Sequence, residues 1–339
     1  MPGLRNESPL RDLLPSTRQF PIRRGGWAVF LALTLVSCAS EPGPKTSDIA
    51  YVRSAETPLF DQLGPSSQMI DSLKAGQQIE IQQKRPRWVQ VRTAKGRSGW
   101  IQEQRLVSQQ VFDQFQRLAS ESKSLPAQGA VRMRREANLH LEPRRDSETF
   151  YQLAEGEEAE ALEHRAVEKS PAYPNDSSAS YQSGEGESGA SLTVEEAEDW
   201  FLIRATEGRA GWVLESAFDM NVPIEVAQYR EGLRIRAWFI LRQEQGGERP
   251  WYLWTTIRRV AGLPYDFDEI RVFVWNPAKS RYETAYRERN LIGFYPIEIG
   301  KQETPSGPAP TFRLQLEDPT GKRFWKNYIL VGRQVRPES

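Results

Sequence analysis

The segment Gly96-Arg97-Ser98-Gly99-Trp100-Ile101 returns later in the chain as Gly208-Arg209-Ala210-Gly211-Trp212-Val213. Two further blocks precede it in both places and in the same order. They are Leu73-Lys74-Ala75-Gly76 with Leu153-Ala154-Glu155-Gly156, and Trp88-Val89-Gln90-Val91-Arg92 with Trp200-Phe201-Leu202-Ile203-Arg204. Three matched blocks in one order indicate that a structural unit occurs twice.

Each copy has the pattern of short β-strands separated by tight turns. Apolar and polar residues alternate with period two around Ile79 and Ile81 and again at 88–92. The glycines of the Gly-x-x-Gly-Trp block mark a sharp bend before the next strand. A run of such strands in each copy favours a small barrel, because closure protects the edges of the sheet.

With Tyr51-Val52-Arg53 and Asn138-Leu139-His140-Leu141 added, both copies resemble the bacterial SH3 (SH3b) domain. The resemblance covers 49–108 and 128–220, and it implies two SH3-like small barrels. It also implies contact with peptidoglycan or with other envelope proteins. Under this hypothesis the binding residues are Trp88 and Trp200, with Trp100 and Trp212 beside the ligand loops, although a Gly-Trp pair also suits a barrel core.

The second copy carries an insertion at about 164–194 that is rich in Ser, Gly, Pro and Glu. Because the segment has few aliphatic residues, burying them cannot offset the conformational entropy that the chain would lose on folding. We therefore expect a disordered loop. It could serve as a solvated spacer or bind a partner. Between the copies, Val111, Phe115 and Leu118 have helical spacing and predict a helical linker at 109–127.

The N-terminus has the features of an export signal. An apolar run at 27–36 is too short to cross a bilayer and ends in Leu35-Val36-Ser37-Cys38. This resembles a bacterial lipobox, which implies a signal peptide at 1–37, a tether at 38–48 and a lipid such as palmitate on Cys38. Because Ala39 is not Asp, we expect an outer-membrane lipoprotein facing the periplasm. An ordinary cleaved signal with an incidental Cys, or a buried strand, is the alternative.

Residues 221–339 form a third region, which we expect to be an antiparallel β domain, either a sheet or a sandwich. This region holds 19 basic and 14 acidic side chains, although the whole chain is neutral. Arg234, Arg236 and Trp238 could bind an anionic or sugar-bearing ligand by stacking and paired hydrogen bonds. Alternatively, arginine stems cover the solvent side of the sheet while aromatic residues fill its core.

Composition argues against most catalytic chemistry. The chain of 339 residues has one Cys and two His, which excludes an internal disulfide and a Cys/His zinc site. His140 and His164 are expected in a barrel strand and in the insertion, so neither is well placed for catalysis. We predict no metal and no cofactor. Two carboxylates, Asp266 and Asp268, could still serve a glycosidase.

The sequence therefore predicts a mainly β protein: two SH3-like barrels joined by a short helix, plus a C-terminal antiparallel β domain. The predicted function is a non-catalytic, lipid-anchored binding or scaffold protein of the bacterial cell envelope. The alternative is a glycan-cleaving cell-wall enzyme with SH3b targeting modules and a carboxylate site in its C-terminal domain. Nucleic acid is not an expected partner.

Overall fold

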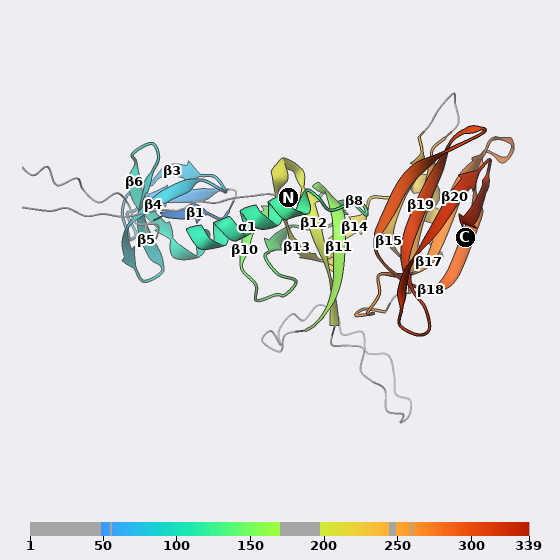
Figure 1. Cartoon of the computed structure of the whole chain (residues 1–339). Coiled ribbons are helices and arrows are strands. Elements are labelled where there is room, and N and C mark those ends of the chain that lie inside the picture. The colour runs from blue at the N-terminus through green and yellow to red at the C-terminus, as the bar shows by residue number, and fades with distance from the viewer. Residues whose placement is uncertain (1–48, 55, 170–196, 244–248, 259, 339) are drawn as a thin grey trace, which may run out of the picture. The chain divides into compact units, whose positions relative to one another are not determined.

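A computed structural model of the chain describes residues 49–54, 56–169, 197–243, 249–258 and 260–338. In this part of the chain, β-strands form three antiparallel sheets of seven strands each (Figure 1). The predicted mainly β fold class is confirmed, including a short helix after the first sheet. The predicted signal peptide and tether, with Cys38, lie outside the described residues.

The first sheet contains the strands of the first sequence copy. Their order across the sheet is β3-β2-β6-β5-β4-β1-β7. The strands are β1 (Ile49–Val52), β2 (Thr57–Phe60), β3 (Met69–Leu73), β4 (Gln78–Arg85), β5 (Trp88–Thr93), β6 (Ser98–Gln102) and β7 (Leu106–Ser108).

The second sheet has the order β10-β9-β13-β12-β11-β8-β14, which is the order of the first sheet with every strand number raised by seven. The duplication seen in the sequence is therefore a duplication of topology. The strands are β8 (Gly129–Met133), β9 (Ala137–His140), β10 (Thr149–Leu153), β11 (Glu158–Glu168), β12 (Ala197–Ala205), β13 (Ala210–Leu214) and β14 (Phe218–Met220).

The repeated Gly-Trp block has a steric reason. A Cβ atom on Gly99 would lie 2.6 Å from the carbonyl oxygen of Phe60, and one on Gly211 would lie 2.7 Å from the Cβ of Leu139. In both copies a neighbouring strand therefore approaches the backbone too closely for any side chain. The following tryptophan is buried in each case, at 8% exposure for Trp100 and 4% for Trp212.

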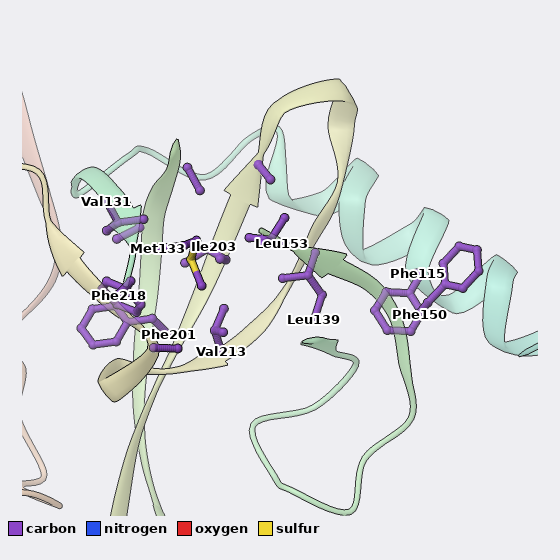
Figure 2. Close-up of a cluster of buried hydrophobic side chains, with 14 of the residues drawn as sticks. Phe115, Val131, Met133, Leu139, Phe150, Leu153, Phe201, Ile203, Val213 and Phe218 are labelled. Carbon is purple, nitrogen blue, oxygen red and sulfur yellow. The ribbon is translucent and has the colours of Figure 1, made fainter. Parts of the chain in front are cut away.

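The largest described apolar cluster lies in the second sheet and on the helix that precedes it. Figure 2 shows its side chains converging from several strands; Phe115, Val131, Met133, Leu139, Phe150, Leu153, Phe201, Ile203, Val213 and Phe218 are labelled. Nearly all of these positions belong to the period-two pattern of the strands. The first sheet has a smaller cluster of its own.

Helix α1 (Gln109–Ser122) follows β7, and the Ser108 hydroxyl caps it by accepting a hydrogen bond from the Val111 N–H at 3.3 Å. On α1, Phe112 stacks on Tyr51 of the first sheet with ring centroids 3.7 Å apart. The same Phe112 makes an edge contact with Phe150 of the second sheet. The predicted linker helix thus packs on both copies. Within the described residues, no helix is long and apolar enough to span a membrane.

The third sheet is a meander in which every strand pairs with its sequence neighbour, in the order β15-β16-β17-β18-β19-β20-β21 (orange to red in Figure 1). A short helix, α2 (Ile224–Ala227), precedes it. The strands are β15 (Arg234–Arg242), β16 (Trp251–Ile257), β17 (Phe267–Asn276), β18 (Arg281–Thr304), β19 (Gly307–Glu317), β20 (Arg323–Val331) and β21 (Gln334–Glu338).

One local expectation differs from the structure. The predicted insertion was placed from residue 164, yet residues 164–168 continue strand β11, because they pair with residues 197–201 of β12. The rest of that insertion, from 170 to 194, lies outside the described residues. Asp266 and Asp268, the candidate carboxylates, are buried at the start of β17.

Candidate functional site

A buried histidine lies where the second and third sheets meet. His164 stands on β11 opposite Phe201 of β12, and its side chain is 2% exposed. Its Nδ1 lies 2.7 Å from Oδ1 of Asp266, just before β17, and its Nε2 lies 3.0 Å from Oδ1 of Asp199 on β12. The imidazole therefore joins two carboxylates that are far apart in the sequence.

This arrangement favours the protonated imidazole. Burial alone would lower the pKa of His164, but the hydrogen bonds to Asp199 and Asp266 outweigh burial and raise that pKa. Burial likewise opposes ionisation of Asp199, but the bond from His164 and the charge of Arg236 hold its pKa far below the ordinary value. Both ring nitrogens of the imidazolium can then donate, one to each carboxylate.

Two arginines of β15 complete the network. Arg236 has no exposed surface, and its guanidinium lies 3.3 Å from Asp199 and 3.1 Å from Glu215. Arg234 contacts the same two carboxylates, at 3.2 Å from Asp199. Three basic side chains thus face three carboxyl groups, and burial raises the pKa of the Glu215 carboxyl above its ordinary value.

A cavity of about 460 Å³ opens beside His164 and Asp266. Its apolar walls include Leu162, Leu263 and Phe294, and Arg165 and Arg323 add charge at its lining. A cavity of this size, with convergent polar groups and titratable residues of shifted pKa, has the properties of a small-molecule or active site.

Tyr295 fixes the second oxygen of Asp266. Its backbone N–H donates to Asp266 Oδ2 at 2.6 Å, and its hydroxyl donates to the carbonyl oxygen of Arg236 at 2.6 Å. Burial raises the pKa of the Tyr295 phenol well above its ordinary value. The neutral phenol therefore serves as a fixed donor, and Asp266 is held from two sides with its carboxylate at the cavity.

The second carboxylate of the predicted pair has a different partner. Asp268 is 7% exposed and accepts from Nε of Arg258 at 3.0 Å. Residues two apart on a strand have Cα atoms about 7 Å apart. The structure therefore brings Asp266 and Asp268 to one end of β17, but only Asp266 lines the cavity.

The predicted aromatic contacts lie mostly in the interior. Trp200 is 1% exposed, and Trp100 and Trp212 are nearly as buried, so these rings do not face solvent. Trp88 is partly exposed at the start of β5 and makes an edge contact with Phe60.

The predicted basic surface of β15 does not face solvent either. Arg236 is fully buried, because the polar side of β15 packs on Asp199 and Glu215 rather than lying in water. Trp238 is partly buried, and its indole N–H donates to the carbonyl oxygen of Ala130 at 3.0 Å.

Sequence reasoning missed His164 and Asp199 as site residues. His164 was assigned to the insertion, and Asp199 stands beside the apolar run that begins at Trp200. One signal was present: Val167 continues the apolar content of β11 beyond residue 164, where the insertion was predicted to begin. Among the described residues, no group of three or more His, Cys, Asp and Glu side chains is arranged to hold a metal ion.

Comparison with known proteins identifies one domain. Residues 63–107 match the bacterial SH3 domain family, so the first sheet contains an SH3b domain. A search of curated proteins returned no match.

Three solved structures are similar to the chain. An NlpC/P60 family protein from Bacillus cereus is 13% identical over 50% of this chain and 55% of its own, with a TM-score of 0.22, so the chain spans about half of that protein. NlpC2 from Trichomonas vaginalis is 11% identical over 86% of this chain and 91% of its own, with a TM-score of 0.17. NlpC1 from Trichomonas vaginalis is 12% identical over 88% of this chain and 90% of its own, with a TM-score of 0.18.

Two predictions are corrected. The prediction of a non-catalytic scaffold protein, and with it the absence of enzyme activity, is contradicted. The alternative prediction, an enzyme that acts on the cell wall and carries SH3b modules, is the better supported of the two. With TM-scores of 0.17–0.22, these likenesses carry no assignment of function or of site residues to this chain.

Proposed function

We propose that this chain is a peptidoglycan hydrolase of the bacterial cell envelope, placed on the wall by its SH3b modules. The observation that carries the proposal is the SH3b domain at 63–107, since such a domain favours peptidoglycan as the ligand and the cell envelope as the location. The cavity beside His164 and Asp266 supplies a place for chemistry.

The second sheet is proposed to be a second SH3b module. Its strand order repeats that of the first sheet, and its Gly211 is packed against a neighbouring strand as Gly99 is. When one module is bound to a polymeric ligand, the other module of the same chain is held at a high effective concentration near that ligand. Tandem modules therefore bind a wall fragment far more tightly than a single module does.

The N-terminal segment supports a membrane anchor. Cys38 follows the lipobox-like Leu35-Val36-Ser37, and we propose that it carries the lipid that holds the protein at the outer membrane, facing the periplasm. Substitution Cys38→Ala should abolish incorporation of labelled fatty acid in cells. Label that stays on the variant would contradict the anchor.

The cavity supports a carboxylate-based reaction on the glycan. Asp266 lines the cavity just before β17, and Asp268 follows two residues later on that strand. Enzymes that cleave glycosidic bonds commonly use two carboxyl groups that flank the bond. We assign Asp266 as the carboxylate at the reacting centre and His164 as the positioning residue that holds it. Asp268, the other carboxylate of the predicted pair, does not line the cavity and accepts from Arg258 instead.

The test is the clearance of a suspension of purified sacculi by the full chain. The expected result is a fall in turbidity with wild type, and a loss of about 100-fold or more in rate for Asp266→Asn. Asp318→Asn is the matched control, because Asp318 lies in an exposed turn of the third sheet and bonds only its own loop. Sacculi that wild type leaves intact, or equal rates for wild type and Asp266→Asn, would refute this assignment.

A further inference from the structure

The outer face of the third sheet carries four polar side chains in one row. Glu298 of β18 stands opposite Arg313 of β19, Arg313 opposite Asn327 of β20, and Asn327 opposite Glu338 of β21. Directly opposite residues in antiparallel strands have Cβ atoms about 4.5–5.5 Å apart. The row is therefore a continuous band of hydrogen-bonding groups across four strands.

A groove lies beside this row. It has a volume of about 330 Å³, and its lining includes the row together with Gly300 and Thr311. Gly300 lies opposite Thr311, whose hydroxyl oxygen would stand 2.9 Å from a Cβ atom on Gly300, so the two strands are closely packed there. Small-molecule sites have volumes of about 300–1,000 Å³, so this groove is at the lower end of that range. It is large enough for one monomer unit of a polymeric ligand.

An exposed tryptophan extends the row. Trp325 is two residues before Asn327 on β20, so both side chains point to the same face. The Trp325 ring is 39% exposed. The guanidinium of Arg313 lies 4.5 Å from its ring centroid and is itself held by Glu298 at 2.6 Å. The ring is thus fixed in place while part of its surface is open to a ligand.

We propose that this surface binds the sugar strand of the cell wall. It consists of the groove residues Glu298, Gly300, Arg313, Asn327 and Glu338, and of Trp325 on the other side of the row, and it is called here the glycan groove. Sugar rings present C–H faces that pack on an aromatic ring, and hydroxyl groups that pair with planar amide, guanidinium and carboxylate side chains. The inference rests on the proposed function and deepens it, because it names the glycan rather than the peptide as the part held by the third sheet.

Charge favours a neutral saccharide over an anion. Arg313 is paired with Glu298, and Glu338 adds a second carboxylate at the far end of the row. Lys301 is the other cation that lines the groove, so an anionic ligand would meet two carboxylates, one paired arginine and one lysine. Hydroxyl groups can instead donate to the carboxylates and accept from Arg313 and Asn327.

The test is titration calorimetry of the purified full chain with N-acetylchitotetraose, a sugar tetramer without peptide. Wild type should bind it, Trp325→Ala should weaken binding by about tenfold, and Asn327→Ala by about threefold. Phe324→Ala is the matched control: Phe324 is the adjacent residue on β20, is 41% exposed, and stands opposite the buried Leu316, on the other face. Its affinity should stay within about twofold of wild type.

The outcomes separate this inference from the proposed function. Absence of tetramer binding by wild type, or equal affinity of wild type and a folded Trp325→Ala chain, overturns the glycan groove, even if sacculi are still cleared. Tetramer binding that depends on Trp325 supports the groove, even if sacculi are left intact. Loss of binding with Phe324→Ala as large as with Trp325→Ala would also overturn it, because the ligand would then not select that face.

Discussion

His164 and Asp266 stand 102 positions apart in the chain, and the Nδ1 of one lies 2.7 Å from the carboxylate of the other. This bond joins strand β11 of the duplicated unit to the start of strand β17 in the C-terminal sheet. Since the cavity opens at the same two residues, the histidine that holds the sheets together also holds the candidate reacting carboxylate.

Replacing His164 by Gln should make the chain less stable at low pH than at high pH, relative to wild type. The pKa of His164 is raised in the folded state, so its contribution is fully present below about pH 6.5, the unfolded value. It is lost as the pH rises through the folded pKa. Urea unfolding of both chains at pH 5.5, 7 and 8.5 measures this; a stability difference that grows with pH would contradict the charged imidazole.

The effect of His140 on stability should depend on pH in the opposite direction to that of His164. Burial lowers the pKa of His140, so protonation of the unfolded chain costs stability below about pH 6.5. His140→Gln should therefore recover stability relative to wild type as the pH falls, in the same urea series. The two variants are controls for each other, and parallel pH profiles would show that the histidines do not act as described.

Arg236→Met should destabilise the fold by about 3 kcal/mol, since Asp199 and Glu215 lose their fully buried cation and keep only the partly exposed Arg234 as an arginine partner. The matched control is Arg281→Met, a largely exposed arginine on β18 whose contact with Glu283 spans 3.6 Å. That change should cost less than about 1 kcal/mol. Chemical unfolding monitored by tryptophan fluorescence distinguishes them, and equal costs would refute the buried network.

Gly99→Ala should destabilise the first sheet by about 1–3 kcal/mol, because the added methyl group meets the Phe60 backbone. Gly211→Ala should do the same in the second sheet, where Leu139 is the obstacle. Ser98→Ala, at the exposed neighbouring position, is the control and should change stability by less than about 0.5 kcal/mol. Thermal unfolding checks all three, and a neutral Gly99→Ala would argue against the close approach of the strands.

The sequence predicted the fold well where local pattern decides it. Matched blocks around Trp88 and Trp200 predicted a duplicated unit, and the two sheets have the same strand order. The helical spacing of Phe115 and Leu118 predicted α1. In the C-terminal region the predicted antiparallel β structure is present as a seven-stranded sheet, whose longest strand, β18, continues across Pro296.

The site was predicted only in part, for a physical reason. Asp266 was identified as a candidate, but its partner His164 comes from another sheet, and no local pattern encodes that meeting. Arg236 was expected on a solvent face because it alternates with apolar residues along β15. Alternation shows that two faces differ, but it does not show what covers the polar face, which here is Asp199 and Glu215.

The central claim is that this chain cleaves the cell wall at the Asp266 cavity. The most direct measurement is mass spectrometry of the soluble material released from purified sacculi by wild type and by Asp266→Asn. Hydrolysis of the glycan predicts muropeptide fragments with new reducing ends from wild type, and a yield lower by about 100-fold from the variant. Release no greater than that from buffer alone, or the same fragments in equal yield from both chains, would contradict the claim.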